Sequence, residues 1–577
     1  MNQQYPVYTE AYNCQDCYKC IRRCPVKAIR IEDNMASIIP ELCTMCGICV
    51  EVCPAGAKQV RNDLTIARSL VKHNSKVIAS VAPAFVAEFP GLTESRLVKA
   101  LRMLGFDQVS ETALGAQMVS HQTAKYIKKN GIHISSACPS VVELVKKYYP
   151  EHEDKIAPIM SPLMAHSKLL KQHFGDDCKV IFIGPCIAKK HEADEMSDLI
   201  DVSITFKDLK KWWDEEGVEL DLIPENDDYF VPYRSHEGAL YPIDGGMIEG
   251  IRKDAGVTDA SFMTFSGQEN VKDVMEELSS WPKDEPLFLE LLACRGGCVN
   301  GPGMENKGAI GFKRHRVIRE CSFPKRTDKA QIQGDLSIDL SLSFLRNSNA
   351  DSKITIEESA ISDALESIGK LTEKDHLNCS GCGYDTCRSF AKAMLEGKAE
   401  RSMCVSFMRK VAHDKASVLL QKIPAAVVVV DDQMKVIESN RRFASLLGED
   451  IEMIFDVQPR LEGSDFRKLL PDYKIFETLL RTGEESMERK VRMNEKLYNI
   501  SVFSIQKYKI VCGIIQNLHD PEVRRDFVRQ QTEDVIKQNM ETVQKIAFLL
   551  GENASHTNSI LNSITESFDA EGVKDEG

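Results

Sequence analysis

Three short apolar runs, each ending at a cysteine, constrain the fold of this chain more than any other feature. They occupy residues 133–137, 180–185 and 287–293 and lead directly into Cys138, Cys186 and Cys294, and Cys298 follows four residues later. Runs of this length and composition are typical of buried parallel strands, and open α/β sheets bind ligands just beyond the carboxyl ends of such strands. The sequence therefore predicts an α/β domain in which four thiolates converge on one cofactor.

The number and clustering of the cysteines indicate metal sites in a reducing compartment. A chain of 577 residues is too long for one hydrophobic core, so several domains are expected. Its nineteen cysteines gather at gaps of two and three residues, which metal sites require and a disulfide framework does not. The N-terminus lacks the pattern of a signal peptide, and no apolar stretch reaches the roughly twenty residues of a membrane span. We expect a cytoplasmic protein with no membrane partner, and the net charge of −13 argues against nucleic acid.

The first seventy residues carry one cysteine spacing twice, each copy closed by a proline. The copies are Cys14, Cys17, Cys20 and Cys24, then Cys43, Cys46, Cys49 and Cys53. This is the spacing of bacterial two-cluster ferredoxins, in which the fourth cysteine of each run serves the other cluster. It predicts one 4Fe-4S cluster on Cys14, Cys17, Cys20 and Cys53 and another on Cys43, Cys46, Cys49 and Cys24. Zinc is the alternative, and the duplication disfavours it. The segment is therefore interpreted as an electron relay.

The three cysteine-bearing loops resemble, in order and spacing, the signature loops of the FeFe hydrogenase catalytic domain. The matching segments are Ser135–Pro139, Gly184–Glu192 and Glu290–Gly301, and the resemblance extends over roughly residues 1 to 320 with the ferredoxin segment included. It implies that Cys138, Cys186, Cys294 and Cys298 hold the 4Fe-4S part of an H-cluster. It also implies that the Cys298 sulfur bridges to a diiron subsite bearing carbon monoxide, cyanide and a bridging dithiolate, and that Lys189 lies beside an iron cyanide.

The departures from this family pattern concern proton transfer. In hydrogen-producing members the residue before the first cluster cysteine is a second cysteine, which passes protons to the diiron site, whereas this chain has Ala137. The outer relay positions keep Ser161 and Glu192, carry Gln122 and Lys125 in place of an acidic pair, and Gly184 and Leu292 replace two methionines. General acid–base transfer contributes about 10² to 10⁴ in rate. We therefore expect the cluster to be kept and its turnover to be low.

A further group of cysteines follows the catalytic segment. Cys379, Cys382, Cys387 and Cys404 resemble the small 4Fe-4S domain of some membrane electron-transport subunits and corrinoid proteins. A helix from Cys387 through Met394 would bring Cys404 back to the loop. A structural zinc site uses the same four thiolates and remains the alternative. With the ferredoxin segment, this makes three 4Fe-4S clusters besides the H-cluster.

The last part of the chain resembles a signalling module. Short β-like segments lie within residues 418–520, and Asn440 stands where it would open a helix after the second strand, a pattern similar to a PAS domain. No haem or flavin signature is present, so its ligand is unknown, and a role in dimerisation alone remains an alternative. Approximate heptads after residue 520 predict a coiled-coil homodimer, or else a helix folded back on its own PAS domain.

Together these patterns predict a multidomain α/β and α+β protein. The expected divisions are a ferredoxin domain at 1–75, an H-cluster domain at 76–345, a small 4Fe-4S domain at 346–410, a PAS domain at 418–520 and a C-terminal helix and tail at 521–577. The resemblance implies a sensory FeFe hydrogenase that slowly oxidises or evolves dihydrogen, exchanges electrons with a partner such as ferredoxin, and signals to a kinase or phosphatase. The alternatives are a metabolic ferredoxin-linked hydrogenase and an iron-sulfur protein lacking the diiron subsite.

Overall fold

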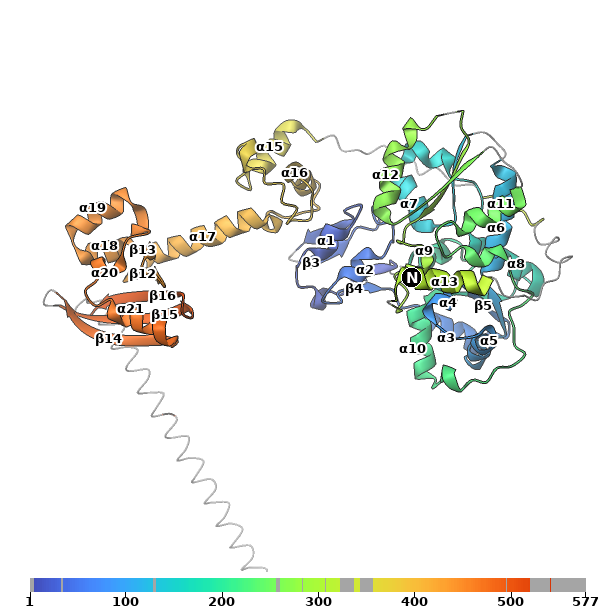
Figure 1. Ribbon diagram of the computed structural model, residues 1–577, viewed down its shortest axis with the longest axis horizontal. Helices are drawn as coiled ribbons and strands as arrows, with labels where there is room; N and C mark the ends of the chain where they lie inside the picture. The colour runs from blue at the N-terminus through green and yellow to red at the C-terminus, as the bar shows by residue number, and fades with distance from the viewer. Residues whose placement is uncertain are drawn as a thin grey trace, which may run out of the picture. The chain divides into compact units, whose positions relative to one another are not determined.

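The computed structural model divides into two compact units, Met1–Met408 and Arg409–Gly577 (Figure 1). It describes residues 5–32, 35–127, 131–255, 260–282, 284–306, 308–321, 337–342, 356–493, 496–518 and 540. The predicted coiled coil therefore lies, apart from residue 540, outside the described residues. Within the described ranges, no helix is long and apolar enough to cross a membrane.

The duplicated cysteine spacing at the start of the chain folds into a duplicated structure. Strand β1 (Val7–Thr9) pairs antiparallel with β4 (Lys58–Val60), and β2 (Ile29–Glu32) pairs antiparallel with β3 (Met35–Ile38). Each run contributes one five-residue helix, α1 (Lys19–Arg23) and α2 (Ile48–Val52). The third cysteine of each run lies in its helix, and the fourth follows the helix directly. The two halves therefore present their cysteines in the same way.

Two parallel sheets form the centre of the first unit. The four-stranded sheet has the order β6-β5-β8-β9, made of Gln108–Glu111, Val77–Val81, Lys179–Gly184 and Val202–Thr205. The three-stranded sheet has the order β10-β11-β7, made of Ser261–Ser266, Leu287–Leu292 and Ile132–Ile134. Strands β5 and β11 are buried along their whole length, because parallel sheets are covered on both faces.

The prediction that the three apolar runs are parallel strands is confirmed. They become β7, β8 and β11, and every pairing of these strands is parallel. The sequence did not show that they belong to different sheets, with β8 in one and β7 and β11 in the other. The cysteines therefore come together at the place where the carboxyl ends of the two sheets meet.

Helices connect and cover these strands. They are α3 (Leu64–His73), α4 (Phe85–Glu88), α5 (Glu94–Met103), α6 (Ala113–Tyr126), α7 (Pro139–Tyr148), α8 (Pro162–Phe174), α9 (Ala188–Glu195), α10 (Phe206–Glu215), α11 (Gly246–Ala255), α12 (Gln268–Glu277) and α13 (Ile310–Cys321). Helices α7 and α9 begin just after cluster-forming loops, since Cys138 is the residue preceding α7 and Cys186 lies two residues before α9. These two helices therefore position the residues around the cysteines.

The remaining elements of the first unit form a small helical domain. It contains α15 (Glu358–Glu366) and α16 (Cys387–Leu395), and α17 (Val405–Lys422) begins directly after Cys404. The side chain of Thr386 caps α16 by accepting from the backbone N–H of Ser389, which explains why this helix begins at Cys387. The division between the two units falls inside α17.

The second unit is built on a five-stranded antiparallel sheet. Its strand order is β13-β12-β16-β15-β14, made of Val436–Ser439, Ala426–Asp431, Ile510–Asn517, Lys496–Gln506 and Ser486–Met493. Between β13 and β14 lie α18 (Arg441–Leu447), α19 (Glu449–Val457), α20 (Phe466–Leu469) and α21 (Lys474–Thr482). Asn440 caps α18 by accepting from the N–H of Phe443 at 3.0 Å, at the position that the sequence predicted.

Candidate functional site

The four cysteines of the three loops lie around one small cavity. Cys138, Cys186, Cys294 and Cys298 line a space of about 390 Å³, and Cys46 of the ferredoxin segment lines it as well. Throughout the described ranges, no three His, Cys, Asp or Glu side chains gather as a single metal ion would require. The four sulfur atoms instead surround a space, which is how four thiolates hold a 4Fe-4S cube.

The electrostatics of these thiols also fit a shared metal cluster. Burial raises the pKa of Cys186 to about 11 and, together with the neighbouring thiols, raises the pKa of Cys294 and of Cys298 well above the usual range. Buried thiols so close to one another cannot all ionise without a compensating charge. Iron supplies that charge when it binds thiolates, so the donor set matches an iron–sulfur cluster.

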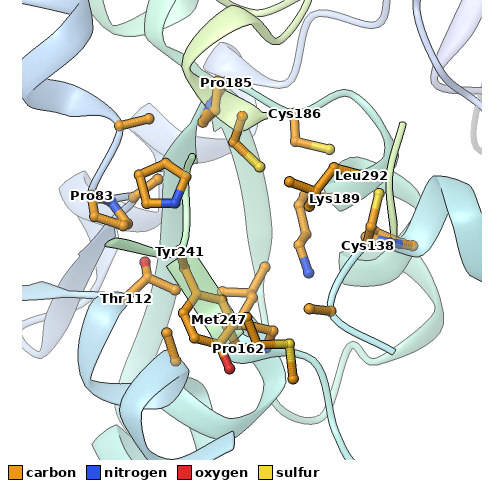
Figure 2. A pocket seen from close by; sticks show the side chains of 18 of the residues that line it. Pro83, Thr112, Cys138, Pro162, Pro185, Cys186, Lys189, Tyr241, Met247 and Leu292 are labelled. Atoms are coloured by element: carbon orange, nitrogen blue, oxygen red, sulfur yellow. The ribbon is translucent and has the colours of Figure 1, made fainter. Parts of the chain in front are cut away.

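A second, larger cavity adjoins the first. It encloses about 770 Å³, and Cys138, Cys186 and Cys298 line it as they line the first cavity. Its wall is mostly apolar, and Figure 2 shows the Lys189 ammonium extending into it between the cysteine side and the side formed by Tyr241 and Met247. A group held here would touch the cube through the shared cysteines, as the diiron subsite of the resembled family requires.

Lys189 is held in this cavity by two of the predicted relay residues. Its Nζ donates to Ser161 Oγ at 2.9 Å and to Glu192 Oε2 at 2.7 Å, and all three side chains are buried. Ser161 also caps α8, because its Oγ accepts from the N–H of Met164. Ser161 and Glu192 line a third cavity, of about 1440 Å³, that Glu143 and His191 share. The structure therefore brings Lys189, Ser161 and Glu192 together between two cavities.

Ala137 lies where the sequence predicted a missing proton donor. It lines the 770 Å³ cavity, and its N–H donates to Ser135 Oγ at 3.2 Å. The outer positions do not replace the lost donor, since the Gln122 amide donates to the carbonyl of Ile338 and Lys125 is exposed on α6. The wall of the cavity is therefore closed by a methyl group at this point.

Gly184 and Leu292, which replace methionines of the family pattern, have different surroundings. A Cβ atom on Gly184 would lie 2.4 Å from the ring of Phe182, so the ring occupies the space of the missing side chain. Leu292 lines both cavities beside the cysteines. The local packing is therefore apolar where the commonest family pattern has thioethers.

Glu290 is a functional candidate to which the sequence reasoning gave no role. It is 2% exposed and lines the 770 Å³ cavity, its Oε1 accepts from the N–H of Met247, and its Oε2 has no partner within the described residues. Burial raises the pKa of Glu290 to about 7. A carboxyl with such a pKa can exist in either protonation state near neutral pH. The signal was an acidic residue inside the otherwise apolar run 287–293.

A chain of buried hydroxyl groups around a histidine was also missed. Thr112 lines the cavity, and its Oγ1 lies 2.8 Å from Ser80 Oγ. His166 lies next, with Nδ1 2.8 Å from Ser80 Oγ and Nε2 2.9 Å from Ser110 Oγ. Burial lowers the pKa of His166 to about 3, so the ring is neutral. A single histidine in an amphipathic helix gives no sequence signal for such a network.

The fourth cysteine of the first ferredoxin run lies among cysteines of the second run. Cys24 of the first run is near enough to Cys46 and Cys49 for its charge to raise their pKa values, although burial is the larger cause. The charges of Cys17 and Cys14 likewise raise the pKa of Cys20, and burial is again the larger cause. The structure thus brings the fourth cysteine of the first run to the second group, as the two-cluster pattern expects.

Three cysteines of the small domain also come together. Burial raises the pKa of Cys382, and the charges of Cys404 and Cys379 act in the same direction. Cys387 begins α16, and its N–H donates to Asn378 Oδ1 at 2.8 Å. Cys404 ends the loop and is followed at once by α17.

Comparison with known proteins assigns a family to the centre of the chain. Residues 75–302 match the family model described as "Iron only hydrogenase large subunit, C-terminal domain". This region is similar to the catalytic domain of FeFe hydrogenases. Residues 6–54 match a "4Fe-4S dicluster domain", and residues 375–406 match a family described as "Putative Fe-S cluster". The chain is therefore an iron–sulfur protein with a hydrogenase-type domain.

Two curated relatives support this assignment. The NADP-reducing hydrogenase subunit HndD of Solidesulfovibrio fructosivorans is 26% identical, over 48% of this chain and 58% of the relative. Iron hydrogenase 1 of Clostridium pasteurianum is also 26% identical, over 39% of this chain and 48% of the relative. The chain thus spans about half the length of the curated relatives it matches.

Solved structures show weaker likenesses. The FeFe hydrogenase HydA1 from Chlamydomonas reinhardtii is 20% identical with a TM-score of 0.37, covering 45% of this chain and 88% of that chain. The PAS domain of an HTR-like protein from Haloarcula marismortui is 16% identical with a TM-score of 0.14, covering 19% of this chain and 98% of that chain.

Proposed function

We propose that this chain is a sensory FeFe hydrogenase of low turnover, which reacts with dihydrogen and reports its redox state through a relay of clusters to a PAS-type unit. The observation that carries the proposal is the cavity beside the four cysteines. It keeps Lys189 with Ser161 and Glu192 and has Ala137 where proton transfer needs a donor. A site built to bind the cofactor but not to exchange protons rapidly suits detection of dihydrogen better than its production.

The residues around the cavity have separable roles in this proposal. An H-cluster, when bound through Cys138, Cys186, Cys294 and Cys298, would supply the reaction of dihydrogen with protons and electrons. Lys189 holds a positive charge inside the apolar wall, and Glu192 and Ser161 fix its direction. A buried ammonium is stabilised by an anionic group such as cyanide, which is why its position fits the cofactor. Proton delivery past Ala137 then depends on slower groups such as Glu290.

The ferredoxin segment is fitted closely against the hydrogenase-type domain. Gly47, in the left-handed region with φ of +79°, would place a Cβ atom 2.5 Å from Pro302 Cγ and 2.9 Å from Ile187 Cδ1. Cys46, which precedes it, lines the cavity of the four cysteines and adds to the charges that raise the pKa of Cys294. Close approach of this kind supports direct electron transfer from the candidate H-cluster to the cluster held by Cys46.

The small domain contacts the first run of ferredoxin cysteines, whereas the hydrogenase-type domain contacts the second run. A Cβ atom on Gly383 would lie 2.7 Å from Ile21 Cγ2, and the Arg22 guanidinium donates to the carbonyl of Gly381 at 3.3 Å. The N–H of Ile31 donates to the carbonyl of Lys398 at 3.3 Å. Ile21 adjoins Cys20, and these contacts therefore support a place for the small domain beside the first proposed ferredoxin cluster. We therefore propose a linear order of four clusters, with the small-domain cluster last.

The end of this relay adjoins a signalling helix in the sequence. Cys404 is followed by α17, whose last residues lead into β12 of the second unit. The strand order of that unit, with its helices between the second and third strands in sequence, supports the proposal of a PAS domain. We propose the domain limits 1–75, 76–345, 346–410, 418–520 and 521–577, and signalling by a homodimer to a kinase or phosphatase.

Infrared spectroscopy of anaerobically matured protein tests the proposal first. Carbonyl and cyanide bands are expected, and their absence would leave an iron–sulfur protein without a diiron subsite. Hydrogen evolution is then measured with a reduced viologen dye. Rates about 10² to 10⁴ below those of metabolic FeFe hydrogenases are expected, because one proton-transfer group is missing. Rates equal to those enzymes would contradict the sensory function.

A further inference from the structure

The two halves of the ferredoxin segment differ by a full charge at one buried position. In the first half Ala28 and Ile29 are the third and fourth residues after the cysteine–proline pair, and Ala57 and Lys58 hold the same positions in the second half. The backbone geometry is the same, since the N–H of Ala28 donates to Cys24 Sγ at 3.3 Å and that of Ala57 donates to Cys53 Sγ at 3.2 Å. Ile29 is 1% exposed and Lys58 is 2% exposed. The chain therefore places a lysine where its own repeat places an isoleucine.

The contacts of Lys58 do not neutralise its charge. Its Nζ donates to the carbonyl of Ala36 at 2.7 Å and to Thr9 Oγ1 at 2.5 Å, and both acceptors are neutral. Among the residues that the structure describes, no carboxylate forms an ion pair with it. A buried ammonium without an anionic partner is costly, so a compensating negative charge is expected close by.

The candidate clusters are a source of that negative charge close to Lys58. Lys58 directly follows Ala57, whose N–H donates to Cys53 Sγ, and the Ala36 residue that accepts from its Nζ packs in one buried cluster with Cys20 and Cys49. Burial is the main cause that raises the pKa of Cys20 and of Cys49, and the charge of Lys58 opposes it at both. Cys20 belongs to the first proposed cluster and Cys49 to the second. The lysine is therefore near enough to act on both clusters.

We infer that Lys58 is an electrostatic tuning residue that favours the reduced state of both ferredoxin-type clusters. A 4Fe-4S cube with four thiolate ligands is an anion and gains one more negative charge on reduction. A fixed positive charge in a buried, weakly screened position stabilises the more negative state. Lys58 thus makes these clusters better acceptors for electrons that leave the candidate H-cluster. This inference rests on the proposed function, because it requires the two clusters.

The test compares midpoint potentials in full-length protein with its clusters assembled. Redox titration followed by electron paramagnetic resonance is made on Lys58→Met and Lys58→Gln, which remove the charge, and on Lys58→Arg, which keeps it. For the neutral variants we expect the ratio of reduced to oxidised cluster at a fixed potential to fall about tenfold, a shift of about 59 mV for one electron. Lys58→Arg should keep the potentials of the unsubstituted protein.

Lys19 supplies the matched control, because it adjoins Cys20 in sequence and its side chain is exposed. Lys19→Met removes the same charge from a solvent-screened position and should leave the ratio of reduced to oxidised cluster unchanged within about twofold.

Equal midpoint potentials in Lys58→Met and unsubstituted protein would overturn the inference. Loss of the clusters in both neutral variants but not in Lys58→Arg would also overturn it, since the charge would then serve assembly. Absence of iron and of cluster signals in unsubstituted protein would instead refute the proposed function.

Discussion

At the scale of single residues, the proposed function assigns to Ala137 the separation of cofactor binding from the supply of protons. Its neighbours preserve the cavity, since Cys138 is in place and Lys189 is held by Ser161 and Glu192. Proton transfer through this position between the cavity and solvent requires a side chain that can lose and regain a proton. In the proposed function the alanine would therefore lower the rate of the reaction without changing the ligands of the cluster.

Replacing this alanine by cysteine tests whether the rest of the family's relay survives. A new thiol at position 137 would need an acidic partner, but Gln122 donates to the carbonyl of Ile338 and Lys125 is exposed. We expect Ala137→Cys to raise hydrogen evolution less than about tenfold, below the about 10² to 10⁴ of a working general acid. The rate is measured with viologen dye on protein whose infrared bands match the unsubstituted form. A gain of a hundredfold or more would show that a functional outer route remains.

The buried histidine gives a second prediction, on the stability of the hydrogenase-type domain. Burial lowers the pKa of His166 from 6.5 to about 3, so the unfolded chain takes up a proton below pH 6.5 while the folded chain does not. Stability should therefore fall as the pH falls through this range, by about 1.4 kcal/mol per pH unit at most. Denaturant unfolding between pH 5.5 and 8 should show that the unfolding free energy of His166→Gln decreases less toward acid pH than that of the unsubstituted protein. His73 is exposed on α3, so His73→Gln should keep the full decrease in unfolding free energy at acid pH. Identical slopes in all three proteins would contradict this prediction.

At the scale of elements, the join between α2 and the hydrogenase-type domain depends on Gly47. A side chain there meets Pro302 Cγ at 2.5 Å, and an L-residue at φ of +79° adds about 1 to 2 kcal/mol of strain. Gly47→Ala should lower the unfolding free energy by about 1 to 3 kcal/mol more than strain alone, through overpacking. It should also slow reduction of the ferredoxin-type clusters by dihydrogen.

Gly56 is the matched control for this prediction. It lies in the same segment with φ of +61°, and the nearest atom to an added Cβ is Gln59 Nε2 at 4.0 Å. Gly56→Ala therefore has the backbone strain without the collision. Both variants are compared by thermal unfolding and by stopped-flow reduction of the clusters. Equal decreases in stability and in the rate of cluster reduction in the two variants would mean that the contact of α2 with Pro302 contributes to neither.

The elements that the sequence predicted well are those with strong local patterns. The three cysteine-bearing strands appear where they were expected, and the strands of the second unit lie within the expected residues 418–520, because continuous or alternating apolar residues fix them locally. Their distribution between two sheets depends on long-range packing and had no local signal. The attachment of the small domain was missed for the same reason, since Arg22 and Gly381 are 359 residues apart.

The candidate site was predicted only in part: the cysteine ligands were predicted, and the single buried polar residues were not. Cysteine spacing identified the ferredoxin and small-domain thiols that the structure gathers, and the apolar runs that end at cysteines identified the four thiols of the candidate site. Glu290, His166 and Lys58 were given no role. Each is a single polar residue whose significance comes from burial, and burial is a property of the folded chain.

At the scale of the whole molecule, the proposed relay connects the cavity of the candidate H-cluster to the beginning of a helix. Its two joins are close contacts at Gly47 and at Gly383, and its last ligand, Cys404, immediately precedes α17. The Sγ of Cys404 lies 3.4 Å from the hydroxyl of Ser406, and the N–H of Met408 donates to the carbonyl of Cys404. A change of charge at the last cluster would therefore act on the first turn of α17.

This coupling predicts a redox-dependent change of hydrogen exchange in α17 of the full-length protein. Because Cys404 precedes the first turn of the helix, reduction by dihydrogen should alter exchange of the amides within 405–422 relative to oxidised protein, while α21 of the second unit should be unaffected. Mass spectrometry of peptides from the two states measures both segments at once. Cys404→Ser, which removes the last ligand, should abolish the difference while leaving the carbonyl and cyanide infrared bands intact. An α17 response that persists in Cys404→Ser would show that the signal leaves the catalytic domain without passing through the small-domain cluster.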